Sequence, residues 1–193
     1  MARPVQFDRN DVLEKAMQAF WDQGYNATSM SDLVDATDLG PGSIYAAFHS
    51  KEGLFLAALD HYAEHSMTKI ERALTEADSP LEGIRSYFRK LGREAAGEHA
   101  NRSCLLTNTV LEMARQNGIV QKRVNRHLGA IEALFRQTLE SAQTNGELSP
   151  DKDPKALATF LMTSIWGLRV LGGTNPAPAR TGSVIHQLLT LLE

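Results

Sequence analysis

The chain has 193 residues, of which 42% are hydrophobic and 22% charged, and its formal net charge is −3. This length is sufficient for a sizeable core, and no apolar run reaches the roughly eighteen residues that a membrane-spanning helix needs. The single cysteine, Cys104, excludes an internal disulfide, and no signal peptide follows Met1. We therefore expect a cytoplasmic protein with no membrane partner.

The first seven residues read as a loose arm followed by an amphipathic helix. Arg3 in this arm either reaches into a DNA minor groove or belongs to a disordered terminus, and the sequence leaves both open. Asp8 is placed to cap a first helix that ends at Gly24. Apolar residues recur at three- and four-residue steps between them, so this helix is expected to brace the next two helices of the chain.

Residues 29–48 read as two short helices joined by a tight turn. Ser29 and Asp32 have the spacing of a capping box at the start of the first helix. Gly40 is expected to take the positive φ that the turn needs, and Pro41 suits the first position of the second helix. Such a pair is typical of the helix-turn-helix, whose second helix enters the major groove of DNA.

The rest of the chain continues with helical periodicity and no alternating strand pattern. Expected helices cover residues 51–77, 80–95, 105–113, 119–144, 154–171 and 181–192, separated by Gly, Asn and Pro turn signals. The fold class is therefore all-α, with nine helices in two domains. We assign residues 1–50 to a helix-turn-helix DNA-binding domain and residues 51–193 to a ligand-binding and dimerisation domain.

At its N-terminal end the chain resembles the TetR-type transcriptional regulators. The resemblance covers residues of about 7 to 56 and departs from the usual pattern at Pro41, Ala46 and Ala47. It is carried by the series Gly24-Tyr25, Thr28-Ser29, Leu33, Leu39-Gly40, Gly42-Ser43-Ile44-Tyr45, Phe48, Ser50-Lys51-Glu52 and Leu54. The resemblance implies a DNA-binding regulator that acts as a dimer and responds to a small molecule.

The expected DNA contacts lie on and beside the second helix of the pair. Its outward face of small residues can approach another surface closely. We expect the residues nearest the bases to be Gly40, Pro41, Gly42 and Ser43. We expect phosphate contacts from Thr28, Tyr45, His49 and Lys51.

The charge of this region argues against DNA binding. Residues 1–60 hold four Lys or Arg against nine Asp or Glu, a net charge of −5, whereas nucleic-acid binders usually carry a basic footprint. The alternative is therefore a helical ligand-binding or interaction protein that kept the fold and lost DNA binding. An ordinary helical corner would also fit the pattern of residues 29–48.

The last two helices carry more apolar surface than a small bundle can bury. We expect them to pack against the same pair of a second chain. The resulting homodimer would bind a palindromic operator with its two helix-turn-helix domains, the heads, about 34–36 Å apart. Between the head and these helices a cavity could hold a small-molecule effector, although the same spacing fits a plain core. Its expected lining is Phe88, Leu91, Cys104, Leu105, Asn108, Met113, Phe135, Met162 and Trp166.

Cys104 stands at the expected start of a helix, beside Arg102. This setting favours the thiolate, which is the reactive form, and similar regulators sense electrophiles or oxidants with a cysteine placed in this way. A buried cysteine that packs as a small hydrophobe is the alternative.

Nothing in the chain predicts an enzyme, a metal or a cofactor. There is no glycine-rich phosphate loop, no G-x-S-x-G and no Cys/His pair at a recognisable spacing. His61, Glu64 and His65 match H-x-x-E-H, but the sequence places no further carboxylate beside them, and an exposed helix face explains them better. We expect a ligand-responsive, DNA-binding transcriptional regulator that acts as a repressor.

Overall fold

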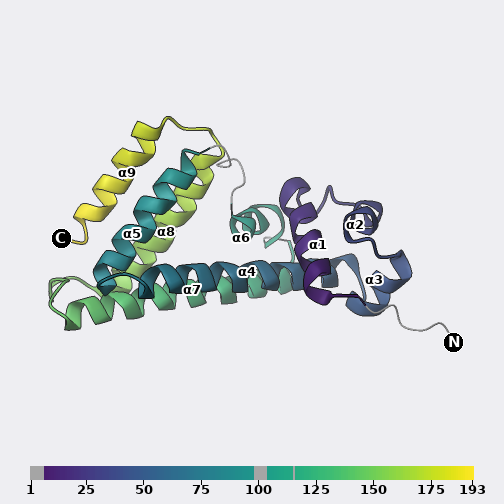
Figure 1. The fold of residues 1–193 in the computed structure, drawn as a ribbon, viewed down its shortest axis with the longest axis horizontal. Coiled ribbons are helices and arrows are strands. Elements are labelled where there is room, and N and C mark those ends of the chain that lie inside the picture. The colour runs from purple at the N-terminus through teal and green to yellow at the C-terminus, as the bar shows by residue number, and fades with distance from the viewer. Residues whose placement is uncertain (1–6, 98–103, 115) are drawn as a thin grey trace. The chain divides into compact units, whose positions relative to one another are not determined.

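A computed structural model describes residues 7–97, 104–114 and 116–193 of the protein, and this part of the chain contains helices and no strand (Figure 1). The all-α prediction is confirmed. The helices are α1 (Arg9–Gln23), α2 (Met30–Thr37), α3 (Pro41–Phe48), α4 (Lys51–Thr75), α5 (Pro80–Ala95), α6 (Leu105–Thr109), the π-helical turn η1 (Val110–Ala114), α7 (Gly118–Thr144), α8 (Pro154–Gly172) and α9 (Pro178–Thr190).

Two of these elements differ from the sequence-based expectation. The α-helical hydrogen bonding of α6 ends at Thr109, and the chain continues as a π-helical turn to Ala114. The last helix begins at Pro178, three residues before the expected start, because proline is well suited to the first turn of a helix. No helix among the described residues is both long and apolar enough to cross a bilayer.

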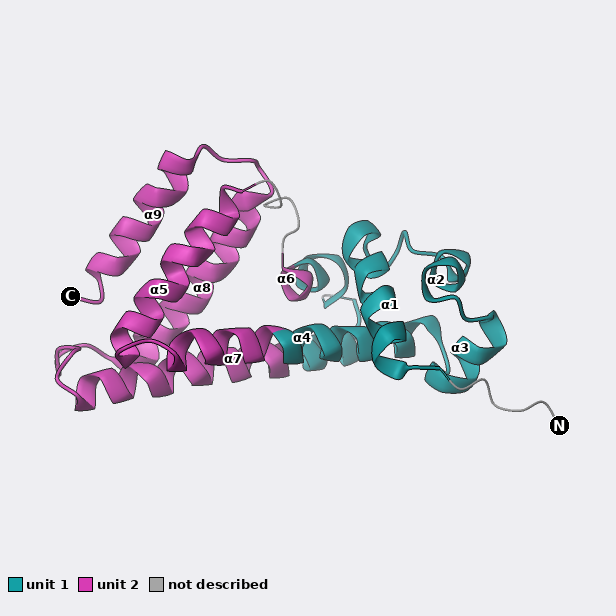
Figure 2. Ribbon diagram, viewed as in Figure 1, with its two compact units in different colours: residues 1–65, 108–124 teal, residues 66–107, 125–193 magenta. Residues whose placement is uncertain are grey.

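The described chain divides into two compact units (Figure 2). Unit 1 comprises residues 1–65 and 108–124, and unit 2 comprises residues 66–107 and 125–193. The division follows packing and falls inside α4, α6 and α7, so each of these helices contributes to both units. The predicted domain boundary after residue 50 concerns the DNA-binding segment and stays a prediction.

Unit 1 is held together by aromatic packing between α1 and the first half of α4. The ring of Phe20 meets that of Phe55 edge-on at 5.0 Å, and Trp21 meets Tyr62 in the same way at 5.0 Å. Ile44 and Leu33, from α3 and α2, are fully buried. The three short N-terminal helices therefore share one core with the start of α4, which fixes the orientation of α3 within the unit.

The turn between α3 and α4 depends on one glycine. A Cβ at Gly53 would clash with the backbone carbonyl oxygen of Phe48, and a backbone atom cannot move aside as a side chain can. The hydroxyl of Ser50 accepts a hydrogen bond from the Gly53 amide at 2.9 Å. This close approach starts α4 directly after α3.

In unit 2, α5 packs against both α8 and α9 (Figure 1). Its apolar face is buried throughout, from Leu81 to Ala95, and Phe88 meets the ring of Phe135 on α7 at 6.0 Å. Gly92 lets α5 approach α9 closely, because a Cβ there would overlap the side chain of Ile185. The long-range packing of unit 2 thus centres on α5.

Candidate nucleic-acid interface

The start of α2 is fixed by a capping box, as predicted. The amide of Asp32 donates to the Ser29 hydroxyl at 3.1 Å, and the amide of Ser29 donates to the Asp32 carboxylate at 2.7 Å. These bonds satisfy amides that a helix N-terminus leaves free. Hydrogen bonding with the Ser29 side chain lowers the pKa of the Asp32 carboxyl, and hydrogen bonding with the Ser29 amide lowers it further by a smaller amount.

The turn between α2 and α3 differs from the expectation in one respect. Asp38 takes the left-handed conformation, with φ of 58°, whereas Gly40 is extended, with φ of −61° and ψ of 153°. The prediction of a positive φ at Gly40 is therefore wrong. Aspartate tolerates the left-handed region, and here its carboxylate is held by Lys15 at 3.1 Å. Pro41 occupies the first turn of α3, as predicted.

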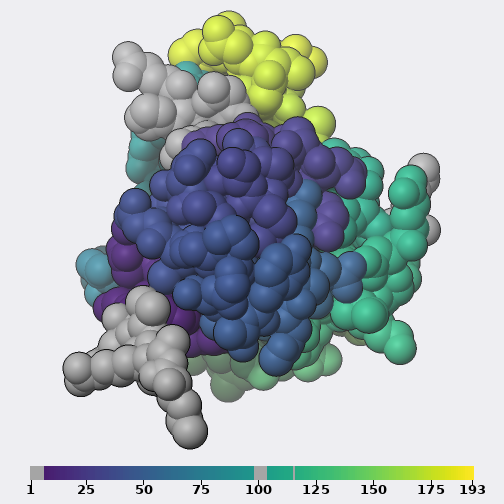
Figure 3. Space-filling view, turned by 90° about the vertical axis from the view of Figure 1, so that its right-hand side faces the viewer, coloured from purple at the N-terminus to yellow at the C-terminus, as the bar shows by residue number. Residues whose placement is uncertain are grey.

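Helix α3 buries one side and leaves the other bare. Ile44 and Phe48 are buried, whereas Gly40, Pro41 and Gly42 are exposed. No atom lies within 4 Å of a Cβ built at Gly40 or Gly42, so nothing in the described chain covers this side. Figure 3 looks onto this end of unit 1, where the purple-to-blue residues form one continuous surface. A bare, small-faced helix on a packed support can approach another surface closely.

The polar residues expected at phosphates fall into three groups. Tyr45 is 49% exposed and His49 is exposed, so both are available at the end of α3. Lys51 lies with its ammonium 4.4 Å from the centre of the Tyr25 ring and is partly exposed. Thr28 is fully buried, and its hydroxyl donates to the Gly24 carbonyl at 2.6 Å, so the prediction of a phosphate contact by its side chain is wrong. Arg3 lies outside the described residues.

Most carboxylates of residues 1–60 have partners within unit 1. Lys15 lies 3.1 Å from the carboxylates of both Asp11 and Asp38, and these bonds raise its pKa. The Asn117 side chain donates to Glu52 at 2.6 Å, and Arg123 pairs with Asp60. The carboxylates held by a cap, a hydrogen bond or an ion pair are Asp8, Asp11, Glu14, Asp32, Asp38, Glu52 and Asp60. These partners fix the orientation of the carboxylates, and Arg123, which lies outside residues 1–60, offsets one of the charges behind the net −5.

The residues expected to line an effector cavity are divided between the units. Phe88, Leu91, Leu105, Phe135 and Met162 are buried in unit 2. Cys104 is partly exposed and Trp166 is 39% exposed, both also in unit 2. Asn108 and Met113 belong to unit 1. The expected lining remains a prediction, and most of its residues belong to unit 2.

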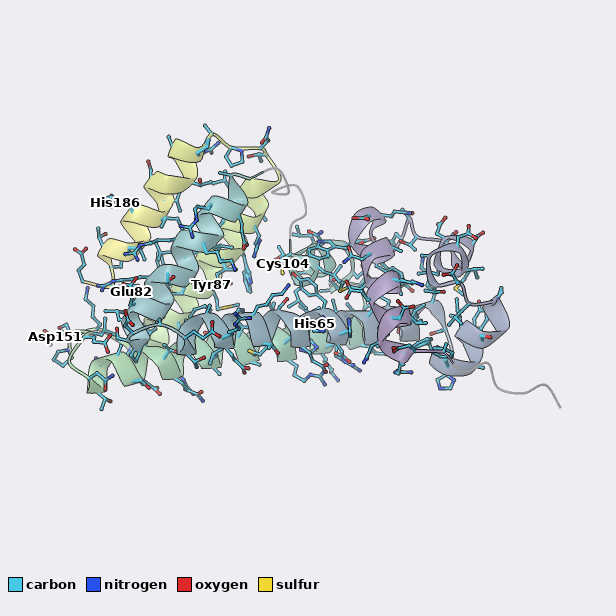
Figure 4. The ribbon with its side chains drawn as sticks, in the orientation of Figure 1. His65, Glu82, Tyr87, Cys104, Asp151 and His186 are labelled. Atoms are coloured by element: carbon cyan, nitrogen blue, oxygen red, sulfur yellow. The ribbon has the colours of Figure 1, made fainter. Side chains whose placement is uncertain are left out.

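Two polar residues that the sequence analysis did not single out accompany Cys104 in unit 2. Thr107 has a buried hydroxyl with no hydrogen-bond partner in the described chain, and a buried hydroxyl without a partner is costly, by about 1–3 kcal/mol. It follows Cys104, the residue before α6, by three positions in the chain. Burial raises the pKa of Tyr87 to about 12; the charge of Arg169 opposes this rise, and the charges of Cys104 and Glu94 add to it. Figure 4 labels Tyr87 and Cys104. A buried hydroxyl without a partner, in the same unit as a partly exposed thiol, suits a polar point of a ligand site.

A second feature invisible in the sequence is the fastening of η1 to the head. The carboxylate of Glu112 accepts hydrogen bonds from the backbone amides of Tyr25 at 3.1 Å and Asn26 at 2.7 Å, in the loop after α1. The partners are 87 and 86 residues apart in the sequence, so no local pattern could predict them. Together with Asn117 and Arg123, Glu112 attaches residues 108–124 to the helices of the head.

The fold and this surface define a helix-turn-helix DNA-binding protein. The model of the bacterial regulatory proteins of the tetR family matches residues 12–58, and that of the tetracyclin repressor-like C-terminal domain matches residues 80–174. The HTH-type transcriptional repressor ComR of Escherichia coli (strain K12) is 32% identical over 190 residues, covering 98% of this chain and 87% of its own. The chain belongs to the TetR family, and it is a DNA-binding transcriptional regulator.

Other relatives and solved structures agree. The HTH-type transcriptional repressor DhaR of Mycobacterium sp. (strain GP1) is 26% identical over 160 residues, covering 82% of this chain and 79% of its own. The structure of a cysteine mutant of the TetR family regulator CifR, complexed with 26-base-pair double-strand operator DNA, superposes with a TM-score of 0.87 at 31% identity and covers all of both chains. The family and these relatives point to a regulator rather than an enzyme.

Proposed function

We propose that this protein is a cytoplasmic repressor that binds a palindromic operator as a homodimer and leaves it when an effector binds unit 2. The observation that carries the proposal is the bare outer side of α3, where Gly40, Pro41 and Gly42 are exposed and no atom approaches a Cβ at either glycine. A helix with no side chains in the way can enter a major groove deeply enough for backbone and flanking side chains to contact phosphates.

Exposed apolar residues on α8 and α9 support the homodimer. Phe160, Val170 and Val184 are 43%, 52% and 41% exposed, and Leu191 at the end of α9 is 43% exposed. A groove of about 490 Å³ runs between these helices, lined in part by Phe160, Val184 and Leu191. Exposed apolar patches of this kind mark interaction sites, and a second copy of the same pair of helices would complete a four-helix interface.

The effector is proposed to bind unit 2 near Cys104, Tyr87 and Thr107. A small molecule with a hydrogen-bonding group would satisfy the orphan hydroxyl of Thr107, and an electrophile would react with the thiol of Cys104. A structural change at α6 can reach the DNA-binding helices through the chain itself, because α6 continues directly into η1. Within η1, Glu112 binds the backbone amides of the loop after α1. Displacing η1 would release this loop.

Operator binding is tested with the DNA immediately upstream of the protein's own gene. The double variant Tyr45→Ala/Lys51→Glu is expected to lower affinity roughly 100-fold, because it removes an exposed contact and reverses a charge at the end of α3. Lys90→Glu on α5, which changes the net charge equally within unit 2, should leave affinity unchanged. Gel shifts across a salt series measure both.

Binding to that DNA that does not weaken as salt rises, or equal behaviour of the two charge variants, would contradict the proposed contact surface on α3.

The response to electrophiles is tested at the one thiol in the chain. Treatment with N-ethylmaleimide is expected to weaken operator binding by at least about tenfold in the native protein and to leave Cys104→Ser bound, because only Cys104 can react. Mass spectrometry reports the modification, and gel shifts report the affinity. Full modification of Cys104 with unchanged operator affinity would count against release through this residue.

A further inference from the structure

Two histidines and a glutamate meet between α1 and α4 in unit 1. His61 and His65 lie one turn apart on α4, and Glu14 comes from α1. One ligand atom from each, a ring nitrogen or a carboxylate oxygen, lies within 4.8 Å of the other two. The two histidine rings are 4.2 Å apart, centre to centre. Figure 4 shows His65 on α4.

The spacing suits a metal ion. Two ligands of a tetrahedral zinc ion, each about 2.0–2.1 Å from the metal, lie about 3.3 Å from one another. The Nε2 atom of His61 and a carboxylate oxygen of Glu14 are 3.3 Å apart. Histidines four residues apart on a helix project from the same face, so a rotation of the exposed His65 ring brings in the third ligand.

Hydrogen bonding and burial hold Glu14 and His61 in place, as is usual for residues that bind a metal ion. The side-chain amide of Gln18 donates to the other carboxylate oxygen of Glu14 at 3.0 Å, which fixes the carboxylate as an outer-shell partner does. The side chain of His61 is only 11% exposed, whereas His65 is on the surface. The site is therefore anchored on its inner side and accessible to an ion and to water on its outer side.

We propose that Glu14, His61 and His65 bind one divalent transition-metal ion, of which Zn²⁺ is the representative, with solvent completing the coordination. Nitrogen and carboxylate ligands of this kind select such ions over Mg²⁺. The third ligand is Glu14, 47 residues before His61, rather than Glu64 of the H-x-x-E-H pattern, which is exposed on α4. The ion would fasten α1 to α4 within unit 1, and this role is independent of the effector proposed for unit 2.

Zinc binding is measured by calorimetry on the full-length, tag-free protein. We expect one Zn²⁺ per chain, no saturable binding of Mg²⁺, and a melting temperature that rises by a few degrees with excess Zn²⁺, because the ion binds only the folded state. Co²⁺ should give the absorption bands of a low-symmetry site with nitrogen ligands. Glu14→Gln and His65→Gln should each weaken Zn²⁺ binding at least about tenfold.

Three control variants separate this site from adventitious binding. His186→Gln on α9, Glu64→Gln on α4 and Cys104→Ser each remove a potential metal ligand outside the cluster and should leave affinity and stoichiometry unchanged. Because Glu14 and His65 are substantially exposed, circular dichroism of their metal-free variants should match that of the native protein. Zinc binding that survives both Glu14→Gln and His65→Gln, or an absence of saturable binding, would overturn the proposal and leave only a His61–Glu14 hydrogen bond.

Discussion

Replacing Gly42 by leucine is expected to abolish operator binding while the protein folds normally. Gly42 lies in the first turn of α3, is exposed, and has no atom within 4 Å of the position of a Cβ. The Cβ of a leucine there has open space around it, and the substitution stabilises the helix by up to about 0.8 kcal/mol through helix propensity. At the proposed DNA surface, however, the same side chain stands between α3 and the floor of the groove.

The expected loss of affinity is at least about 100-fold, because a rigid helix held off the groove loses its phosphate contacts together with its base contacts. Gly42→Ala adds a single methyl group and should cost several-fold. Thermal melting and gel shifts on the same preparations measure the two effects separately.

Gly129→Leu is the matched control. Gly129 lies within α7, in unit 2, and is likewise exposed with no atom within 4 Å of its Cβ position. The substitution should stabilise the helix by a similar amount and leave operator affinity unchanged. If Gly42→Leu binds the operator as tightly as Gly129→Leu does, α3 does not enter the groove by this side.

The parts of this site that the sequence predicts correctly depend on neighbours in the chain. Ser29 and Asp32 are three residues apart, and Pro41 opens α3 because its ring and missing N–H suit that position alone. The same reasoning failed at Gly40, since the positive φ of the turn falls on Asp38, whose carboxylate is paired with Lys15 from α1. That contact spans 23 residues and has no local signature.

Burial and distant polar contacts account for the remaining differences. Thr28 is polar and comes after the first helix, so its sequence position suits a phosphate contact, yet it is buried and its hydroxyl donates to the carbonyl of Gly24, the residue that ends α1. Glu112 and Glu14 gain their significance only when α1 is brought beside η1 and α4. Periodicity predicts which face of a helix is apolar, but it does not say which helix will meet that face.

Val184→Glu is expected to convert the protein to a monomer and thereby to remove most of its operator affinity. Val184 is 41% exposed on α9 and lines the groove that also includes Phe160, Leu188 and Leu191. If a second copy covers this groove, a stable interface buries about 800 Å² on each partner, and a carboxylate at its apolar centre has no partner to offset its lost hydration. Sedimentation velocity at micromolar concentration should show the native dimer and a monomeric variant.

The expected loss of operator affinity arises because the dimer links two DNA-binding domains. A dimer binds its second half-site as an intramolecular step, so separating the heads costs about 100-fold or more in affinity without altering either contact surface. The matched control is Ile119→Glu, which places the same charge at an apolar residue that is 59% exposed on α7, in the part of that helix that belongs to unit 1. This variant should remain dimeric. A Val184→Glu protein that sediments as a dimer would place the interface elsewhere, whereas a monomer with native operator affinity would show that one head suffices.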